Sequence, residues 1–227
     1  MLKRIAQIVM VLTLPVFLVL TNVRLLMGGA YLRYEYGKVS FATPLGFTVE
    51  ERLDFARASI DYLLSDDGIE ALAALADENG PIYNTRELRH MEDVKALTAK
   101  AFPLGVILGL FLLSLAGVML YRRGETRRAA LRGLVGGAVL TWVVFLSLTA
   151  LVLLNFDWFF TRFHLLFFEG ETWLFSYTDT LIRLFPPQFW FDAAVLVGAL
   201  TLIEAAVVGG AAWLLYRHAR QAARPMD

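Results

Sequence analysis

Four long apolar runs separate stretches in which charged and polar residues are frequent. The runs lie near residues 5–26, 101–121, 133–154 and 192–216. Crossing roughly 30 Å of hydrocarbon takes about 20 residues of helix, and each run reaches that length. The first run is too long for the apolar core of a cleavable signal and lacks a clean cleavage site, so we interpret it as a retained span. The pattern predicts an all-α, polytopic membrane protein with four transmembrane helices, in which residues 1–227 form one membrane domain.

The two longer polar segments, residues 28–100 and 155–191, lie between these runs. In the first of them Thr48 is followed three residues later by Glu51, which is the capping-box pattern of a helix start. Apolar residues then recur at helical spacing and predict one apolar stripe. The stripe consists of Leu53, Ala56, Ile60, Leu63 and Leu64.

Two further helices are predicted in the same segment. "GIEALAALADENG" is expected to form a short helix that ends at Gly80-Pro81, because proline cannot continue a helix. Asn84 with Glu87 repeats the capping pattern and starts the helix that leads into the second apolar run. We therefore expect a small helical cap over the outer mouth of the bundle.

The charges are divided unevenly along the chain. Ten basic residues lie before the first run, between the second and third, and after the fourth: Lys3, Arg4, Arg122, Arg123, Arg127, Arg128, Arg132, Arg217, Arg220 and Arg224. Only Glu125 and Asp227 oppose them, whereas residues 28–100 hold thirteen acids against eight bases and residues 155–191 hold four against two. The positive-inside rule therefore predicts that both termini are cytoplasmic and both large loops extracytoplasmic.

The amino-acid composition is typical of a membrane protein and excludes catalysis by a cysteine thiol. Hydrophobic residues make up 58% of the 227 residues and charged residues 19%, and the mean hydropathy is +0.58. A soluble protein of this composition would expose an unusually apolar surface. The chain has no cysteine, so no thiol nucleophile is available.

Two of the three histidines stand at unexpected places. His90 lies in "RELRHMEDVK", directly before the second apolar run and four residues after Arg86 on the same helical face. Taken alone, it fits a bystander in an exposed, salt-bridged turn. His164, however, lies in the aromatic segment "FFTRFHLLFF" after the third run, where Phe, Trp and Tyr are expected but histidine is not. Because both rings are predicted at the same interface, we expect them to meet. His218 belongs to the basic "RHAR" tail and is expected to contribute only charge.

Three polar residues lie in or beside the apolar runs. Arg24 ends the first run on the side where positive charge is disfavoured. It either snorkels to the headgroup level or meets a carboxylate, a lipid phosphate or a developing oxyanion, with Asn22 nearby. Glu204 lies near the middle of the fourth run, where an ionised carboxylate costs about 2.5–3.5 kcal/mol. We expect Glu204 to be protonated or hydrogen-bonded inside the bundle and to be structural.

Three stretches together resemble a known family. "NVR" in the first run, "RELRHMEDVK", and the segment from "FFTRFH" to "DTLIRLFPPQFW" are similar to the lipoprotein intramolecular transacylases. The similarity covers nearly the whole chain, including the four spans and the two outer loops. The chain departs from the family pattern at "LFSYT" and "PPQ", where the family tends to have an Asp-Pro pair and an acid.

The resemblance implies a specific reaction at the outer leaflet of a bacterial cell membrane. Such enzymes move the sn-2 acyl chain of a diacylglyceryl-modified lipoprotein to the α-amine of its N-terminal cysteine. That amine has a pKa of about 7.7–8.0 and needs a base that works near neutrality, which suits histidine. His90 and His164 are the implied catalytic acid/base pair. The residues expected to bind substrate or stabilise the oxyanion are Arg24, Arg86, Asn22, Arg162 and Asp93.

The implied partners are the lipoprotein substrate and membrane lipids, and no nucleic acid, metal, cofactor or covalent nucleophile is expected. Two other functions stay open at this point. One is a metal-assisted lipid hydrolase with His90, Asp93 and His164 as ligands, which the His-x-x-Asp spacing allows. The other is a non-enzymatic membrane scaffold or lipid-binding module whose loops dock a partner.

Overall fold

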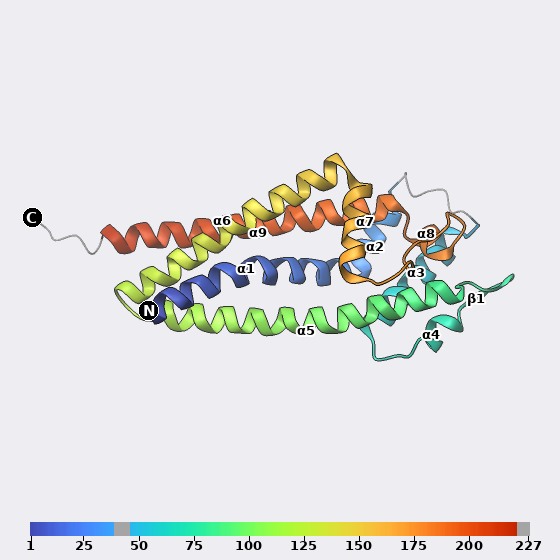
Figure 1. The fold of residues 1–227 in the computed structure, drawn as a ribbon, viewed down its shortest axis with the longest axis horizontal. Helices are drawn as coiled ribbons and strands as arrows, with labels where there is room; N and C mark the ends of the chain where they lie inside the picture. The colour runs from blue at the N-terminus through green and yellow to red at the C-terminus, as the bar shows by residue number, and fades with distance from the viewer. Residues whose placement is uncertain (39–45, 222–227) are drawn as a thin grey trace, which may run out of the picture. The chain divides into compact units, whose positions relative to one another are not determined.

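The computed structural model describes residues 1–38 and 46–221 and is almost entirely helical there (Figure 1). Four helices in this part of the chain are long and apolar enough to cross a membrane: α1 (Leu2–Leu26), α5 (Thr85–Tyr121), α6 (Glu125–Leu154) and α9 (Pro187–Gln221). They confirm the predicted all-α class with four apolar spans. Each helix extends beyond its apolar run, and α5 does so most, since it begins sixteen residues before the run that starts at residue 101.

The chain divides into two compact units. The first, here called the membrane unit, consists of residues 1–23, 103–151 and 195–227. Its core is built from α1, α5, α6 and α9 and contains mainly leucine, methionine and alanine. The buried residues of this core are Met10, Leu14, Leu18, Leu112, Ala116, Met119, Ala129, Ala130, Ala138 and Ala205.

Small residues let these helices approach closely. A Cβ atom at Gly137 on α6 would lie 3.0 Å from the Cβ of Leu14 on α1. A Cβ atom at Gly209 on α9 would lie 2.6 Å from the Cβ of Ala138 on α6. Close backbone approach through glycine and alanine is a usual way for helices to associate in lipid, where no hydrophobic effect drives them together.

The second unit, here called the histidine unit, consists of residues 24–102 and 152–194. It contains α2 (Gly29–Tyr36), α3 (Val49–Leu64), α4 (Glu70–Ala73), α7 (Phe156–Phe167) and α8 (Thr180–Leu184), together with the beginnings of α5 and α9. Its segments are far apart in sequence and are joined by polar contacts. The Tyr36 hydroxyl donates to the carbonyl of Leu184 at 2.6 Å, and the Lys38 ammonium lies 2.5 Å from Glu35 and 2.7 Å from Asp192.

Helix α3 begins as its sequence predicts. The Thr48 hydroxyl accepts from the backbone N–H of Glu51, and the Glu51 carboxylate accepts from the backbone N–H of Thr48. The predicted apolar stripe is only partly buried, because Ala56 and Ile60 are buried whereas its three leucines are half-buried. Polar residues take the other buried places on this helix: Arg52, Ser59 and Tyr62.

The prediction that a short helix ends at Gly80-Pro81 is wrong about where that helix ends. Helix α4 ends at Ala73, and β1 (Ala76–Asp77) then pairs antiparallel with β2 (Gly80–Pro81). The Asp77 carboxylate accepts from the backbone N–H of Asn79 at 2.7 Å, and Gly80 has a φ of 115°. An aspartate that hydrogen-bonds two residues ahead and a glycine with positive φ together form a turn, which competes with the helix.

Candidate active site

The histidine unit brings the two rings together. His90 comes from the second turn of α5 and His164 from the third turn of α7. Their ring centroids lie 6.1 Å apart with an interplanar angle of 26°, and the side chains are only 8% and 9% exposed. The sequence predicted this meeting of residues 74 positions apart. Catalytic groups need to lie within reach of one shared substrate, and two rings at this separation meet that condition.

Aromatic rings surround both imidazoles. His90 packs edge-to-face on Phe168 at 5.1 Å and on Phe175 at 5.3 Å between centroids. His164 lies 4.1 Å from the Phe160 ring and stacks on the indole of Trp173 at 4.9 Å with an interplanar angle of 29°. The site is therefore a pair of imidazoles in an apolar, aromatic environment, where electrostatic interactions are stronger than in water.

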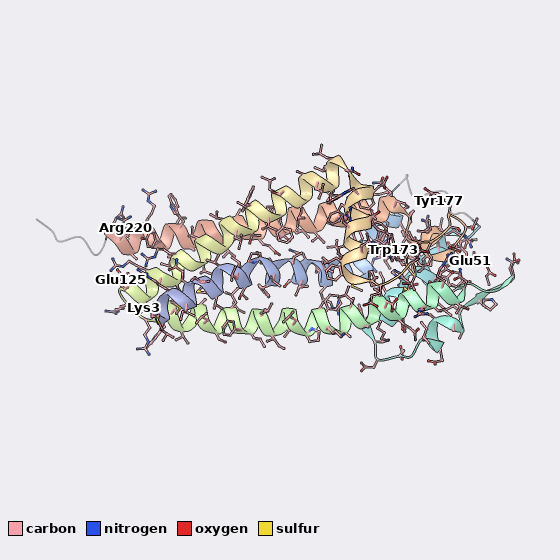
Figure 2. All side chains as sticks on the ribbon, viewed as in Figure 1. Lys3, Glu51, Glu125, Trp173, Tyr177 and Arg220 are labelled. Carbon is pink, nitrogen blue, oxygen red and sulfur yellow. The ribbon has the colours of Figure 1, made fainter. Side chains whose placement is uncertain are left out.

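Sequence reasoning did not single out Trp173. It lies in the segment between α7 and α8, is 9% exposed, and is labelled in Figure 2. In the sequence it is one aromatic residue among many in an interfacial segment, and only the folded chain places its ring on His164. No pattern in the sequence separates it from the other tryptophans.

One hydrogen bond orients the His164 ring. Its Nδ1 lies 2.8 Å from the backbone carbonyl oxygen of Phe160, one turn earlier on α7. A carbonyl can only accept, so Nδ1 carries the proton and Nε2 keeps its lone pair in the neutral ring. His90 is oriented differently, because its Nδ1 is buried and has no hydrogen-bond partner among the described residues.

Burial keeps both imidazoles neutral. Burial, and after it the positive charge that His164 would carry, lower the pKa of His90 from 6.5 to about 4, while the Asp93 carboxylate acts in the opposite direction. Burial also lowers the pKa of His164, against the effect of the hydrogen bond to Phe160. A charged ring is disfavoured in an apolar environment. At pH 7 both rings are therefore unprotonated, with a free lone pair, and each would hold a proton only weakly.

The start of α5 is joined to the loop that carries Trp173. The Asn84 and Glu87 capping pair is present as predicted, with the backbone N–H of Glu87 donating to the Asn84 side chain at 3.0 Å. The Glu87 carboxylate, 1% exposed, accepts from the backbone N–H of Asn84 at 2.9 Å and from that of Leu181 on α8 at 2.7 Å. The Thr172 hydroxyl donates to Asp93 at 3.2 Å.

The five residues expected to bind substrate or stabilise an oxyanion occupy different environments. Arg86 forms a salt bridge with Asp179 at 2.8 Å and lies 5.6 Å above the Phe175 ring, which itself contacts His90. The negative charge of the Asp93 carboxylate favours the protonated form of His90 and so raises the His90 pKa. Both residues are therefore close to the imidazole pair.

Arg24, Arg162 and Asn22 make other contacts. The guanidinium groups of Arg24 and Arg162 lie 5.6 Å above Phe102 and 5.5 Å above Trp158, and both arginines are exposed. The Asn22 side chain belongs to the membrane unit and donates to Thr201 at 3.1 Å and to Glu204 at 2.8 Å. The last bond shows that Glu204 is hydrogen-bonded within the bundle, as expected.

The geometry gives no support to a metal-assisted hydrolase built on His90, Asp93 and His164. Within residues 1–38 and 46–221, no group of three or more His, Asp or Glu side chains is arranged to hold a metal ion.

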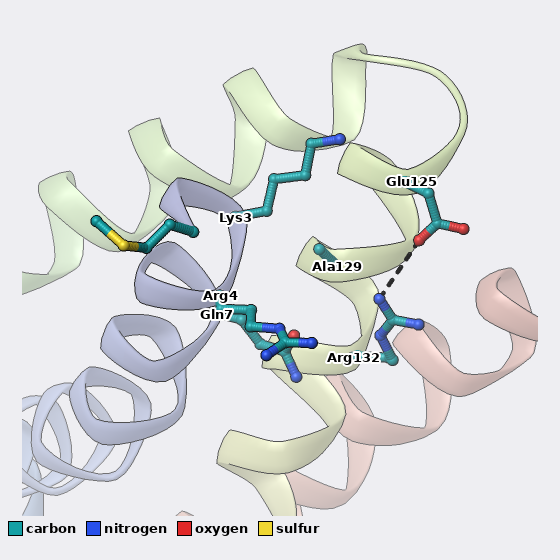
Figure 3. A pocket seen from close by; sticks show the side chains of 7 residues that line it. Lys3, Arg4, Gln7, Glu125, Ala129 and Arg132 are labelled. Carbon is teal, nitrogen blue, oxygen red and sulfur yellow. Dashed lines mark ion pairs between the residues drawn. The ribbon is translucent and has the colours of Figure 1, made fainter.

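A separate pocket of about 310 Å³ lies in the membrane unit, beside the first turns of α1 and α6 (Figure 3). It is lined by Met1, Lys3, Arg4, Gln7, Glu125, Ala129 and Arg132. The Arg132 guanidinium lies 3.6 Å from the Glu125 carboxylate. All of these residues belong to the membrane unit, so this pocket contributes nothing to the imidazole pair.

Comparison with known proteins agrees with these observations. The model of a family described as "Lipoprotein intramolecular transacylase Lit" matches residues 8–190. An uncharacterized protein of Aquifex aeolicus (strain VF5) is 28% identical over 203 residues, which cover 88% of this chain and 90% of that protein.

Two solved structures have the same fold. The in meso structure of the membrane-integral lipoprotein intramolecular transacylase Lit of Bacillus cereus has a TM-score of 0.77 and 21% identity, covering 97% of this chain and 96% of that one. A variant of the same protein with one histidine replaced by alanine has a TM-score of 0.69 and 19% identity, covering 97% and 94%.

Proposed function

Because the chain belongs to the lipoprotein intramolecular transacylase family, which is a family of acyltransferases, we propose that it moves an sn-2 acyl chain within one lipoprotein molecule. The chain leaves the glycerol of the diacylglyceryl group and joins the α-amine of the N-terminal cysteine, which gives an N-acylated lyso-form. The observation that carries this proposal is the pair of buried imidazoles of His90 and His164, whose ring centroids lie 6.1 Å apart.

His164 is the base in this proposal. Its Nδ1 proton is held by the Phe160 carbonyl, so the lone pair of Nε2 is available to the attacking amine. The hydrogen bond fixes the tautomer and the ring orientation, as a carboxylate does in a catalytic triad. As the amine nitrogen forms its bond to the ester carbonyl carbon, His164 takes one amine proton.

His90 is the second proton carrier. The bond between the carbonyl carbon and the sn-2 oxygen breaks, and that oxygen receives the proton that left the amine. A positive charge on one imidazole disfavours a proton on the other, so the pair holds one proton at a time and releases it readily. The amine proton therefore ends on the glycerol oxygen, and no atom is gained or lost.

The apolar surroundings support an acyl substrate. Aromatic rings contact both imidazoles, and apolar walls of this kind accept hydrocarbon chains. Donor and acceptor groups belong to one substrate molecule, so a site that folds the head group replaces a bimolecular encounter by an intramolecular step. Such positioning can supply about 7–11 kcal/mol of the barrier.

Mass spectrometry of a reporter lipoprotein tests the reaction. Intramolecular transfer leaves the intact mass of the N-terminal lipopeptide unchanged, while its α-amine stops reacting with an amine-specific reagent and its fragment spectrum contains N-acyl cysteine. We expect this change in cells that express the chain and not in cells that lack it. A reporter that loses the mass of one acyl chain would indicate a hydrolase, and one whose amine stays reactive would exclude transfer.

We place both termini in the cytoplasm and the histidine unit outside, on the strength of the charge asymmetry. Because the chain has no cysteine, single cysteines report topology cleanly. Asp66→Cys and Glu171→Cys, both at exposed positions of the histidine unit, should label from outside with an impermeant thiol reagent. Arg123→Cys, on the loop between α5 and α6, should label only after permeabilisation. The reverse pattern would place the substrate in the other leaflet.

The rate should depend on pH through the substrate amine and not through a histidine of ordinary pKa. Both imidazoles must be neutral to accept a proton, and burial lowers the pKa of each below 6.5, to about 4 for His90. Both therefore stay neutral as the pH falls from 8 to 7. The amine, with a pKa of about 7.7–8.0, becomes protonated over this range. We expect kcat/KM for a synthetic lipopeptide to rise to about pH 8 with no inflection near 6.5. An inflection near 6.5 would contradict buried, neutral bases.

A further inference from the structure

Trp173 presents a hydrogen-bond donor that the protein itself does not use. Its side chain is 9% exposed, and its indole Nε1 is buried with no hydrogen-bond partner among the described residues. A buried indole N–H normally finds an acceptor, because leaving it unpaired costs free energy. Trp190 in the same unit follows that rule, since its Nε1 donates to the carbonyl oxygen of Phe185 at 3.1 Å.

The position of the indole relates this donor to the reaction. Its ring stacks on His164 at 4.9 Å with an interplanar angle of 29°. An indole N–H lies in the plane of its ring, so in a stacked pair it runs alongside the imidazole and does not point into it. The imidazole therefore does not use this N–H, which stays unpaired beside the base.

The transacylation proposed above requires such a donor. When the amine attacks the ester, the carbonyl oxygen becomes an oxyanion, and preorganised donors directed at that oxygen in an apolar site are among the strongest catalytic devices. The rings that contact the imidazoles are phenylalanines apart from Trp173, and phenylalanine has no donor.

The other nearby donors have partners already. The Arg86 guanidinium is paired with the Asp179 carboxylate at 2.8 Å. The Thr172 hydroxyl, next to Trp173 in sequence, donates to Asp93 at 3.2 Å. Among the described residues around the two imidazoles, His90 and Trp173 both have a buried ring nitrogen without a partner. His90 is assigned to proton transfer in the proposed reaction, so the N–H of Trp173 is the buried donor left for the carbonyl oxygen.

We propose that Trp173 is a catalytic residue whose indole N–H donates to the carbonyl oxygen of the migrating acyl group as that oxygen becomes negative. The inference rests on the proposed transacylase function. In this step the amine nitrogen bonds to the carbonyl carbon and the oxygen takes up the electron pair of the carbonyl double bond. When the bond to the glycerol oxygen breaks, the pair returns to the carbonyl. Trp173 keeps its proton throughout.

Replacing the N–H while keeping the ring tests this role. Trp173 is replaced by benzothienylalanine, in which sulfur takes the place of the N–H in a bicycle of nearly the same shape, and in parallel by phenylalanine (Trp173→Phe). The purified full-length protein is assayed with a synthetic diacylglyceryl lipopeptide, and the N-acylated product is measured by mass spectrometry. We expect kcat to fall by about 10²–10³ with little change in KM, because the donor acts mainly in the transition state.

A matched control is benzothienylalanine at Trp142, which is 41% exposed on α6 in the membrane unit, where kcat should be unchanged. A benzothienylalanine variant at position 173 that keeps the wild-type kcat would overturn the proposal and leave Trp173 as a packing wall. A rise in KM alone would overturn it too, since that indicates substrate binding. Failure of the wild-type protein to acylate the lipopeptide would instead reject the proposed function, and the role of Trp173 with it.

Discussion

Replacing either His90 or His164 by alanine is expected to abolish N-acylation of a reporter lipoprotein, and the double variant should be no worse than either single one. A positioned acid or base contributes typically about 10²–10⁴ in rate. Two residues that act in one proton transfer fail together, because the loss of either disables the same step. The facing rings of the two imidazoles, 6.1 Å apart, are the structural reason to expect this non-additivity.

Phenylalanine variants separate chemistry from packing at these positions. Both imidazoles pack among aromatic rings, so His90→Phe and His164→Phe keep an apolar ring in place but cannot carry a proton. They should be as inactive as the alanine variants and more stable than them in thermal melts in detergent. His218→Ala, at an exposed position of α9, should keep full activity. A His164→Phe variant that still acylates the reporter would remove His164 from the mechanism.

Two other substitutions should reduce N-acylation less than the loss of either histidine. Arg24→Ala should leave a residual rate, because the exposed Arg24 guanidinium over Phe102 can add no more than one charge-stabilising interaction to the donor proposed at Trp173. One such interaction is worth about 10²–10³ and not the whole reaction. Glu204→Gln should have little effect, because an amide oxygen can accept from Asn22 as the carboxylate does at 2.8 Å. If Glu204→Gln were inactive while either histidine could be replaced freely, the chemistry would lie in the membrane unit and not at the imidazole pair.

Glu87→Ala is expected to destabilise the histidine unit by several kcal/mol. Its buried carboxylate accepts from the backbone N–H groups of Asn84 and Leu181. Alanine would leave both donors without this acceptor, and an unsatisfied buried group costs about 1–3 kcal/mol. The first bond caps α5 and the second holds α8, so the loss should appear as a lower Tm in detergent and as faster amide exchange in residues 180–184.

Two control variants test whether the loss of stability comes from the hydrogen bonds of the Glu87 carboxylate. Glu87→Gln keeps one acceptor oxygen and should lose less stability than Glu87→Ala. Glu92→Ala removes the same side chain from an exposed position one and a half turns further along α5 and should change Tm little. Equal losses at positions 87 and 92 would show that the contact between α5 and α8 does not carry the stability of this unit.

The features that local sequence determines were predicted well. The four spans were found because crossing a membrane requires an apolar run of fixed length, which is a property of contiguous residues. The capping pairs Thr48 with Glu51 and Asn84 with Glu87 were found because each acts within one turn of helix. The helix predicted to reach Gly80-Pro81 failed because a turn around Asp77 competes with helix over the same residues.

The candidate site was predicted in part. The meeting of His90 and His164 followed from two residues that were unusual for a membrane interface, and the structure places their rings together. The role of Arg86 was less visible, because its partner Asp179 lies 93 positions away. Glu87 was identified as a cap, whereas its second oxygen, which accepts from Leu181, came to light only in the folded chain.

The sequence by itself determined the class of the protein, its four spans, and the two histidines on which the proposed chemistry depends. The tertiary structure alone decided which residues surround those histidines. Trp173 is one aromatic residue among many in its segment, and it becomes distinct only through its stacking on His164 and its unpaired N–H. The physical reason is that hydropathy and capping act between near neighbours, whereas the contacts of a buried side chain depend on how distant segments pack.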